Sequence, residues 1–332
     1  MKLSSFSALL VAGASLAAHA NADFKITPDR TVKAATSKHV NYVKQWTLSA
    51  GTNTDFIDSI DLSLAGNAFV SYVDGLPADV IGYVNVSGDS RAVVNAVTVS
   101  KDVLNDIEND MNDLLDIDSD GGELNVWLGP TATSGYLFTE IFLASPNAVT
   151  ELKSQRSAQV VVENGVLAVK GKRTELQIDA TGSSAVYVSD PKTDVSVKEL
   201  SLETTGKASI DYNVKSVAAR TELKMESKST SSITVLSSTV QTSTLELKAD
   251  ISSSICISAK EVTAKTPTLK GKDQISMPNA AKTYGAAGTE ACEEAALPAR
   301  KAGKVTGVVA GLTNILTGED NDDLDDDNET ED

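Results

Sequence analysis

The stretch from Leu176 to Ala259 contains four similar segments: LQIDATGSSAVYV from Leu176, LSLETTGKASIDYNV from Leu200, LKMESKSTSSITVL from Leu223 and LELKADISSSICISA from Leu245. Each opens with alternating apolar residues, breaks at a small polar patch and then resumes the alternation. The opening leucines are 24, 23 and 22 residues apart. A period in the low twenties with two-residue alternation inside it is typical of the coils of a β-solenoid.

A third short strand recurs between these segments, at Val195 with Val197, then at Val217, Val240 and Val262. Three short strands per coil, with corners rich in Ser, Thr, Gly and Lys, predict an all-β fold: a right-handed parallel β-helix over residues 46–277, most regular from residue 150. A lone coil cannot bury its inner face, so we expect the stack to fold as a unit with both ends covered. Aromatic residues make up only 5% of the chain, which also suits stacked strands of β-branched residues.

The first twenty residues resemble a signal peptide. Lys2 precedes a short apolar run, and Ala18-His19-Ala20 fits a cleavage site, so the mature chain is expected to start near Asn21. No later stretch reaches the roughly 18 apolar residues that a membrane-spanning helix needs. We therefore expect a secreted, extracellular or cell-surface protein without a transmembrane segment, in which residues 21–45 form an extended lead-in or cap.

Strands are expected from Trp46 onward, including DVIGYVNVSG from Asp79 and AVVNAVTVS from Ala92. The spacing of Val103, Ile107, Met111 and Leu114 instead predicts one short helix over Ser100–Leu115. Strands resume as LLDIDS and ELNVWL around an Asp-Gly-Gly turn.

The C-terminal part departs from the repeat. Residues 278–318 are expected to form a cap and linker with a short helix over Lys304–Leu316. The last fourteen residues, 319–332, contain ten Asp or Glu and no Lys or Arg, so we expect a disordered acidic tail. The net charge of the whole chain is −17, which disfavours nucleic acid as a partner.

The two cysteines are Cys256 and Cys292. In an exported chain an even pair suggests one disulfide. Cys256 lies between Ile255 and Ile257, which should point inward, so its own side chain should point outward and meet a segment that crosses the solenoid surface. The alternative is two free thiols.

Two local motifs have both a functional and a plain structural interpretation. Asp116, Asp118 and Asp120 match the first ligand positions of a calcium loop, but the twelfth position is Trp127 and not Glu, and an Asp-Gly-Gly hairpin turn needs no ion. Asn85-Val86-Ser87 is a glycosylation sequon, with Asn85 a candidate acceptor if the source is eukaryotic.

Catalytic groups are sparse. After signal removal the only histidine is His39, and a zinc site built from His and Cys is excluded by count. Asp179, Glu203, Asp211 and Glu226 are expected on coil faces as ordinary solvated residues. We therefore expect no catalytic residues, no cofactor and no enzyme activity.

Four stretches resemble a known family: FIDSIDLSLAGNAFVSYVDG, VNVSGDSRAVVNAVTVS, LLDIDSDGGELNVWL and AVTELKSQRSAQVVVENGVLAV. Together they are similar to the GIN domain, an auto-transporter adhesin head domain, over roughly residues 56–277. The resemblance implies a secreted or surface-displayed β-helix with an adhesive role, and it supplies no catalytic residues. The helical segment and the acidic tail depart from the family pattern.

Three functions remain open at this stage. The first is a non-enzymatic, adhesin-like protein that binds surface glycans or proteins through its hydroxyl-rich faces. The second is a β-helical carbohydrate-active enzyme, a polysaccharide lyase or hydrolase, which would need clustered Asp with Arg or Lys; Arg156, Arg173 and Arg220 are expected to be scattered. The third is a structural wall or matrix component whose acidic tail gathers cations.

Overall fold

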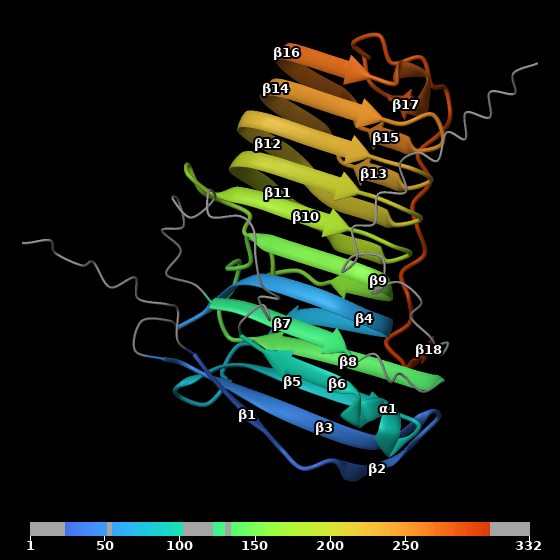
Figure 1. The fold of residues 1–332 in the computed structure, drawn as a ribbon. Helices are drawn as coiled ribbons and strands as arrows, with labels where there is room; N and C mark the ends of the chain where they lie inside the picture. Colours follow the sequence, from blue (N-terminus) through green and yellow to red (C-terminus); the bar gives the residue numbers. More distant parts are fainter. Residues whose placement is uncertain (1–23, 52–54, 102–121, 130–133, 306–332) are drawn as a thin grey trace, which may run out of the picture.

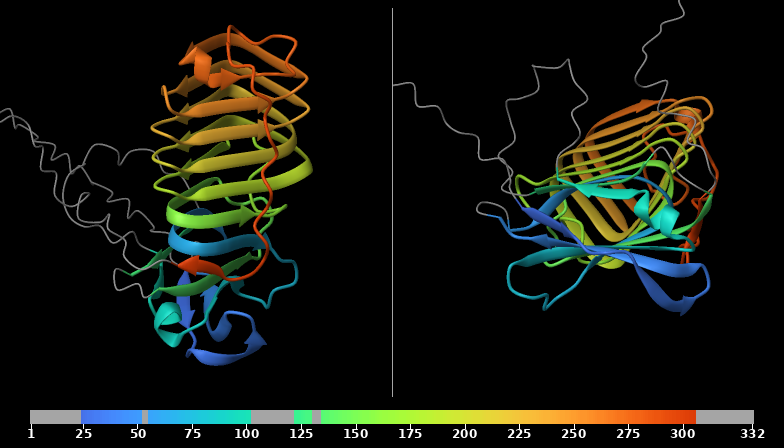
Figure 2. Two further views of the ribbon diagram at one scale, coloured as in Figure 1. Left: turned by 90° about the vertical axis from the view of Figure 1, so that its right-hand side faces the viewer. Right: turned by 60° about the horizontal axis from the view of Figure 1, so that its bottom comes forward.

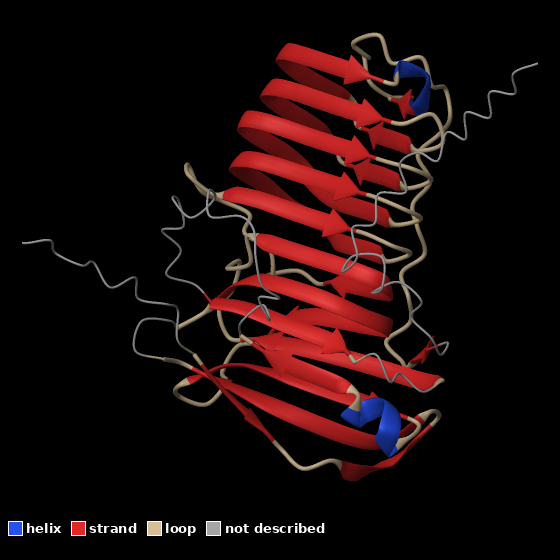
Figure 3. Ribbon diagram, viewed as in Figure 1, coloured by secondary structure: helices blue, strands red, loops and turns tan. Residues whose placement is uncertain are grey.

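The computed structural model describes residues 24–51, 55–101, 122–129 and 134–305. These residues form one hydrogen-bonded system of strands with one short α-helix and one 3-10 turn (Figures 1 and 3). The N-terminal strands are β1 (Lys25–Pro28), β2 (Val32–Ser37), β3 (Val40–Ser49), β4 (Ile57–Tyr72), β5 (Val80–Gly88), β6 (Val97–Ser100), β7 (Gly122–Leu128) and β8 (Gly135–Leu143). The later strands are β9 (Glu151–Val162), β10 (Glu175–Ala180), β11 (Ala185–Thr204), β12 (Ser209–Ser227), β13 (Ser232–Leu236), β14 (Thr239–Ala249), β15 (Ser254–Ser258), β16 (Glu261–Lys270), β17 (Ile275–Ser276) and β18 (Gly303–Val305).

The predicted β-solenoid is confirmed, with about five turns. All pairings among β9 to β17 are parallel, and the strands stack in order along the long axis of the molecule (Figure 1). Leu176 pairs with Leu200, Leu200 with Leu223, and Leu223 with Leu245, so the four opening leucines lie one above another. The fifth position of this column is Pro267, on β16 at the edge of the stack.

The other two columns also follow the repeat. Val186, Ile210, Ile233 and Ile255 pair in succession, and so do Val195, Val217, Val240 and Val262. All eight side chains are at most 3% exposed. Because side chains alternate across a strand, each coil places its apolar residues inside and its polar residues outside, and stacking joins the interiors into one core.

The coils start later than the sequence predicts. Strands β1, β2 and β5 pair antiparallel with β3, and β8 pairs antiparallel with β5, so the segment expected as an extended lead-in belongs to an antiparallel sheet. β4 joins this sheet to the solenoid, because it pairs in parallel with β7 and β8 and also with β9. The antiparallel sheet covers the N-terminal end of the stack (Figure 2).

One helix is found where a strand is predicted. α1 (Arg91–Asn95) begins after Ser90, whose hydroxyl accepts a hydrogen bond from the backbone N–H of Val93 at 3.2 Å. This N-cap satisfies an otherwise free donor, and the α1 residues Val93 and Val94 are buried. Only the second half of AVVNAVTVS, Val97–Ser100, is a strand. The helix predicted over Ser100–Leu115 lies outside the described residues from residue 102 onward.

The last coil is covered by the segment after β17. The Tyr284 hydroxyl accepts a hydrogen bond from the Ala264 backbone N–H and donates one to the Val262 carbonyl oxygen, while Ala280 and Ala286 pack against the core. A 3-10 turn, η1 (Lys272–Gln274), precedes β17.

From residue 289 the chain turns back and runs down the outside of the solenoid to the N-terminal sheet (Figure 2, left). We call residues 289–302 the C-terminal strap. The strap leads into β18, which pairs antiparallel with β8. The helix predicted over Lys304–Leu316 is therefore wrong at its start, because Lys304 lies in a strand; residues 306–332, including the acidic tail, and the signal segment lie outside the described residues.

Candidate functional site: a polar hollow on the N-terminal sheet

The first strand of each coil carries a row of charged side chains on its outer surface. Asp61, Lys153, Asp179, Glu203, Glu226 and Lys248 occupy successive positions of one column. Glu151, Lys224 and Glu246 lie in the adjacent column. We call these nine residues the charge ladder. Asp179, Glu203 and Glu226, predicted as separate solvated residues, are thus brought into one row.

The charges of the ladder pair with one another. Lys153 lies 2.6 Å from Glu151, and Lys224 lies 2.5 Å from Glu203 and 3.6 Å from Glu226. Lys228 lies 3.0 Å from Glu226, and Lys248 pairs with Glu246. Hydrogen bonding to Lys228 lowers the pKa of Glu226, which matches a carboxylate held by a cation.

Two carboxylates at the N-terminal end of the ladder are less well satisfied. Burial raises the pKa of Asp61 to about 6, although Lys153 opposes the shift, and burial also raises the pKa of Asp179. One oxygen of each carboxylate is buried without a hydrogen-bond partner among the described residues. Asp61 and Asp179 pair with opposite sides of Lys153 in the ladder.

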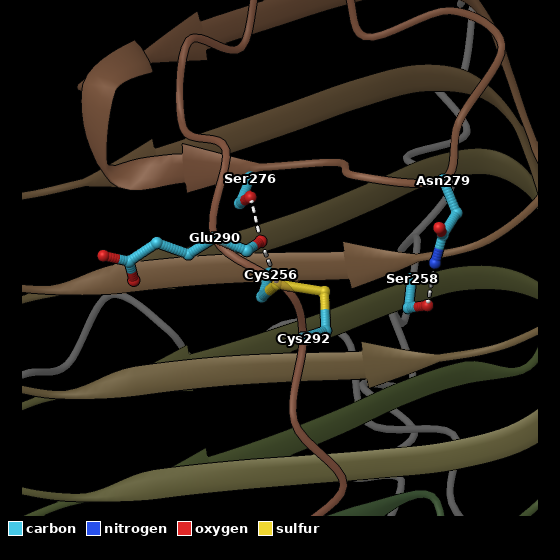
Figure 4. Close-up of a disulfide and its surroundings, with 6 residues drawn as sticks. All are labelled: Cys256, Ser258, Ser276, Asn279, Glu290 and Cys292. Atoms are coloured by element: carbon cyan, nitrogen blue, oxygen red, sulfur yellow. Dashed lines mark hydrogen bonds between the residues drawn. A yellow bond between two sulfur atoms is a disulfide. The ribbon is translucent and has the colours of Figure 1, made fainter.

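The second outer face of the coils is covered by the C-terminal strap. The predicted disulfide is confirmed: Cys256 and Cys292 are joined with a Cα–Cα distance of 5.4 Å (Figure 4). Cys256 points outward between two buried isoleucines, as predicted. Next to it the Ser276 hydroxyl donates to the Glu290 carbonyl oxygen at 2.6 Å (Figure 4).

The lower end of the strap is held by Arg300. Its guanidinium lies 2.8 Å from Glu140 and 2.9 Å from Glu163, and it also packs over the ring of Phe69 at 5.1 Å. The Asn67 side chain donates to the carbonyl oxygen of Lys301 at 3.0 Å. The strap therefore connects the last coils to β4 and β8.

The remaining candidate carboxylate, Asp211, lies under the strap and not on the charge ladder. Burial raises its pKa to about 6. Its neighbours in register are Tyr187 and Thr234, and it lines a small space of about 20 Å³ together with Glu294 and Leu297 of the strap. This position favours a structural role for Asp211.

Other predicted residues are dispersed. Arg156 donates to the Leu128 carbonyl oxygen at 2.5 Å, while Arg173 and Arg220 are exposed on other coils. His39 stacks on Tyr136 with ring centroids 3.6 Å apart. The calcium-loop candidates Asp116, Asp118 and Asp120 lie outside the described residues. Within the described ranges, no group of three or more His, Cys, Asp or Glu is arranged to hold a metal ion, and no helix is long and apolar enough to cross a membrane.

A different kind of surface lies on the N-terminal sheet. β1 ends at Pro28 and β2 begins at Val32, so residues 29–31 leave the sheet between two strands that pair with the same partner, β3. The backbone N–H of Asp29 donates to the Gln45 carbonyl oxygen at 2.8 Å and anchors this connection. A hollow of about 450 Å³ lies there, lined by Asp29, Arg30, Val32, Val43, Gln45 and Asn85. The hollow is an open depression of the surface and not an enclosed cavity, so a ligand bound there would stay partly exposed to solvent.

The polar side chains of the hollow have no partners within the described part of the chain. Arg30, Asp29 and Gln45 form no side-chain hydrogen bond or ion pair there, and the Oδ1 atom of Asn85 is buried without a hydrogen-bond partner. Gln45 and Asn85 face each other in register on β3 and β5. The hollow is therefore lined by one cation, one anion and two amides, of which the Asn85 amide has its oxygen buried.

Asn85, predicted as a glycosylation acceptor, thus lies in the middle of an antiparallel sheet, between Gln45 on β3 and Glu140 on β8. A glycan attached to its side chain would have to occupy the hollow.

The distribution of basic residues in the sequence is the one feature that points to this site. Residues 24–50 contain five basic residues, Lys25, Arg30, Lys33, Lys38 and Lys44, and one acidic residue, Asp29. The segment therefore carries a net charge of +4 in a chain whose net charge is −17. These residues belong to β1, β2 and β3 and their connections, which form one side of the hollow.

No protein-family model matches the chain, and no curated protein or solved structure is detectably similar to it.

Proposed function

We propose that the protein is a secreted or cell-surface, non-enzymatic β-helical protein with an adhesin-like role, which binds surface glycans or proteins. The observation that carries the proposal is the contrast between the two polar surfaces. Every lysine of the charge ladder pairs with a carboxylate, although Asp61 and Asp179 each keep one buried oxygen without a partner. In the hollow, the side chains of Asp29, Arg30 and Gln45 pair with none of the described residues. Unpaired polar groups around a concave surface are the usual basis of ligand orientation and specificity.

Three further features support this role. The disulfide between Cys256 and Cys292 suits an oxidising compartment. The molecule is elongated, and β1, β2 and β3, which border the hollow, lie at one end of it (Figure 1), where a bound glycan would not meet the stacked coils. The resemblance of residues 56–277 to the GIN domain, an adhesin head domain, points in the same direction.

A glycan array together with cell-surface fractions tests the proposal. The mature protein should bind defined members of the array, and the reducing-end content of the bound glycans should stay constant over hours. Binding to neither glycans nor any surface fraction would contradict the proposal, and so would turnover of a bound polysaccharide.

One observation favours a second candidate, a carbohydrate-active enzyme. Asp61, with its pKa of about 6, lies two strands away from Asp179, and strands are spaced about 4.8 Å apart. Two carboxyl groups roughly 9–10 Å apart, one of them protonated near neutral pH, are near the upper end of the separation used by inverting glycosidases. For this function, release of reducing ends from a polysaccharide should be lost in Asp61→Asn and in Asp179→Asn but kept in Glu246→Gln.

A further inference from the structure

We propose that the hollow between β1, β2, β3 and β5 is a binding site for a sugar that carries a carboxylate, of the uronic acid class, with Arg30 as the group that recognises the carboxylate. The inference rests on the proposed glycan-binding function and specifies its site and its substrate class. It uses only residues that line the hollow.

Arg30 supplies the positive charge of the hollow. Arg30 is exposed at the rim of the hollow and has no ion-pair partner among the residues that the structure describes. Some basic side chains pair with carboxylates, as Lys224 does with Glu203, while others, such as the exposed Arg173 and Arg220, form no ion pair among the described residues. What distinguishes Arg30 is that it is the one basic residue that lines the hollow. A guanidinium offers two parallel N–H donors in a geometry that fits one carboxylate. An unpaired arginine at the mouth of a polar hollow is therefore suited to an anionic ligand.

The other polar groups of the hollow are the side chains of Asp29, Gln45 and Asn85. Gln45 and Asn85 each provide an amide with donors and an acceptor, and Asp29 provides acceptors only. Hydroxyl groups, which both donate and accept, complement this set. The Oδ1 atom of Asn85 is buried and unpaired, so toward the hollow the amide offers its N–H donors, which can bind a hydroxyl or carboxylate oxygen.

The hollow also offers an apolar surface. Val32 and Val43 also line the hollow as a register pair on β2 and β3, and Val32 is 56% exposed. A pyranose ring has hydroxyls at its edge and C–H groups on its faces, so a ring can contact the two valines while its edge reaches the amides. A carboxylate side chain of an acidic peptide also fits Arg30, but it has no hydroxyls for Gln45, Asn85 and Asp29. The acidic sugar uses the whole set, and the peptide uses one member.

The distribution of charge along the chain determines which part of the surface attracts an anionic ligand. The whole chain is strongly acidic, which repels an anionic ligand from most of its surface. Residues 24–50, which form β1 to β3, carry a net charge of +4, while residues 55–101, which include β5, carry −4. Only the border of the hollow formed by β1 to β3 is therefore basic, and it is the part that attracts an anionic ligand.

Titration calorimetry with the mature protein tests the site. The probes are a trimer of galacturonic acid, a trimer of galactose as the neutral counterpart, and a short peptide rich in Asp and Glu. The wild type should bind the acidic trimer more tightly than both other probes. Arg30→Gln should weaken binding of the acidic trimer on the order of tenfold or more, because a charge-assisted hydrogen-bonded pair is lost. Asn85→Ala should also weaken it, with thermal stability unchanged, since the amide oxygen has no partner to lose.

Lys248→Gln is the matched control. It removes one positive charge from the charge ladder, far from the hollow, and should leave the affinity for the acidic trimer within a factor of two. A thermal melt of each variant shows that the fold is retained.

Three outcomes contradict the inference. Equal affinity of Arg30→Gln and wild type for the acidic trimer would exclude Arg30 as the recognition group. Tighter binding of the acidic peptide than of the acidic trimer would indicate a protein partner at the hollow. Absence of any binding of the acidic trimer by the wild type would remove the substrate class. If the wild type still binds other glycans on the array, the proposed function stands without this site; if it binds none and no surface fraction, the proposed function fails as well.

Discussion

The charge ladder of the solenoid and the hollow of the N-terminal sheet are both polar surfaces on strands, but they differ in how far their side chains pair with one another. On the ladder, Lys224 lies between Glu203 and Glu226, and Lys153 contacts Glu151. In the hollow, Arg30 and Gln45 have no side-chain partner among the described residues. Strand geometry explains the difference.

Parallel coils in constant register place each outward side chain about 4.8 Å from its counterparts in the coils on either side. Opposite charges on such a face pair with one another, as Lys224 does with Glu203, although Asp179, Glu203 and Glu226 are like-charged neighbours in one column. The hollow lies where the chain leaves the sheet between β1 and β2, so Asp29 and Arg30 have no neighbour in register, whereas Gln45 and Asn85 face each other on β3 and β5. In this protein the repeat forms the stacked coils, and the proposed binding site lies on the antiparallel sheet that covers their N-terminal end.

The largest effect on the scaffold should come from Leu223→Ala. Leu223 is fully buried and contacts the leucine column on both sides. We expect the free energy of unfolding to fall by about 3–5 kcal/mol, because a large cavity is left in the shared core. Chemical denaturation measures this change. Binding at the hollow should persist at temperatures below the lowered Tm, and its loss in a folded Leu223→Ala protein would show that the two regions are not separable.

The disulfide should have the next largest effect. Cys256 and Cys292 are 36 residues apart, and removing both by Cys256→Ser with Cys292→Ser should lower stability by about 3–4 kcal/mol in the chain-entropy model. Denaturant unfolding of the oxidised wild type and of the double variant gives the difference. Hydrogen exchange should increase in the strap near residue 292 and stay unchanged in the hollow. An unchanged midpoint of unfolding would mean that Arg300 and β18 alone hold the strap.

Gly206 tests the tight stacking of the coil corners. Its φ is 86°, and an added Cβ would lie 2.7 Å from the carbonyl oxygen of Gly182 in the coil below. Gly206→Ala should therefore lower stability by about 1–3 kcal/mol, from backbone strain together with a clash that only a shift between coils relieves. Gly75 is the matched control: its φ is 76°, but a Cβ there meets nothing within 4 Å. Equal melting temperatures for Gly206→Ala and Gly75→Ala would argue against close stacking at the corner.

Asp211, under the strap, should make stability depend on pH. Burial raises its pKa to about 6 in the folded protein, above the value of about 3.9 for an exposed aspartate. The folded state therefore holds its proton more tightly, and stability falls as the pH rises from about 4 to 6. Asp211→Asn lacks this penalty and should be more stable than wild type at pH 8 by about 1 kcal/mol, a value reduced for solvent screening, and equal to it at pH 4. Thermal melts at both pH values check the sign; a variant that is less stable at pH 8 would contradict it.

The smallest effect should come from a single charge of the ladder. Lys248→Gln removes one exposed ion pair with Glu246, and such pairs contribute little to stability because water screens them. Its melting temperature should therefore change little, and less at high salt than at low salt. A loss of several kcal/mol would show that the ladder stabilises the coils more strongly than exposed pairs usually do.

The solenoid could be predicted from the sequence because its repeat has a single physical cause. Alternation at Leu176, Leu200, Leu223 and Leu245 fixes which side chains point inward, and the same alternation places Cys256 outward, where it meets Cys292. Each of these conclusions needs only local periodicity.

The antiparallel sheet and the hollow could not be predicted in this way. Alternation is the same in parallel and antiparallel strands, so the pattern around Trp46 and Val84 does not reveal that β3 and β5 run in opposite directions. Similarly, the pattern AVVNAV predicts a strand, because the pattern does not reveal that Ser90 caps a helix, α1, which contains its first four residues. The hollow depends on residues 40 positions apart, Gln45 and Asn85, that only the folded register brings together. The excess of basic residues between 24 and 50 was the one available clue.

Hydrogen exchange of the mature protein with and without a saturating acidic sugar trimer tests the central claim most directly, because it reports on both regions at once. The account predicts slower exchange in peptides that cover residues 28–46 and 80–88, and unchanged exchange in peptides that cover the charge ladder of β10, β12 and β14. Protection along the ladder strands, with none at the hollow, would contradict it.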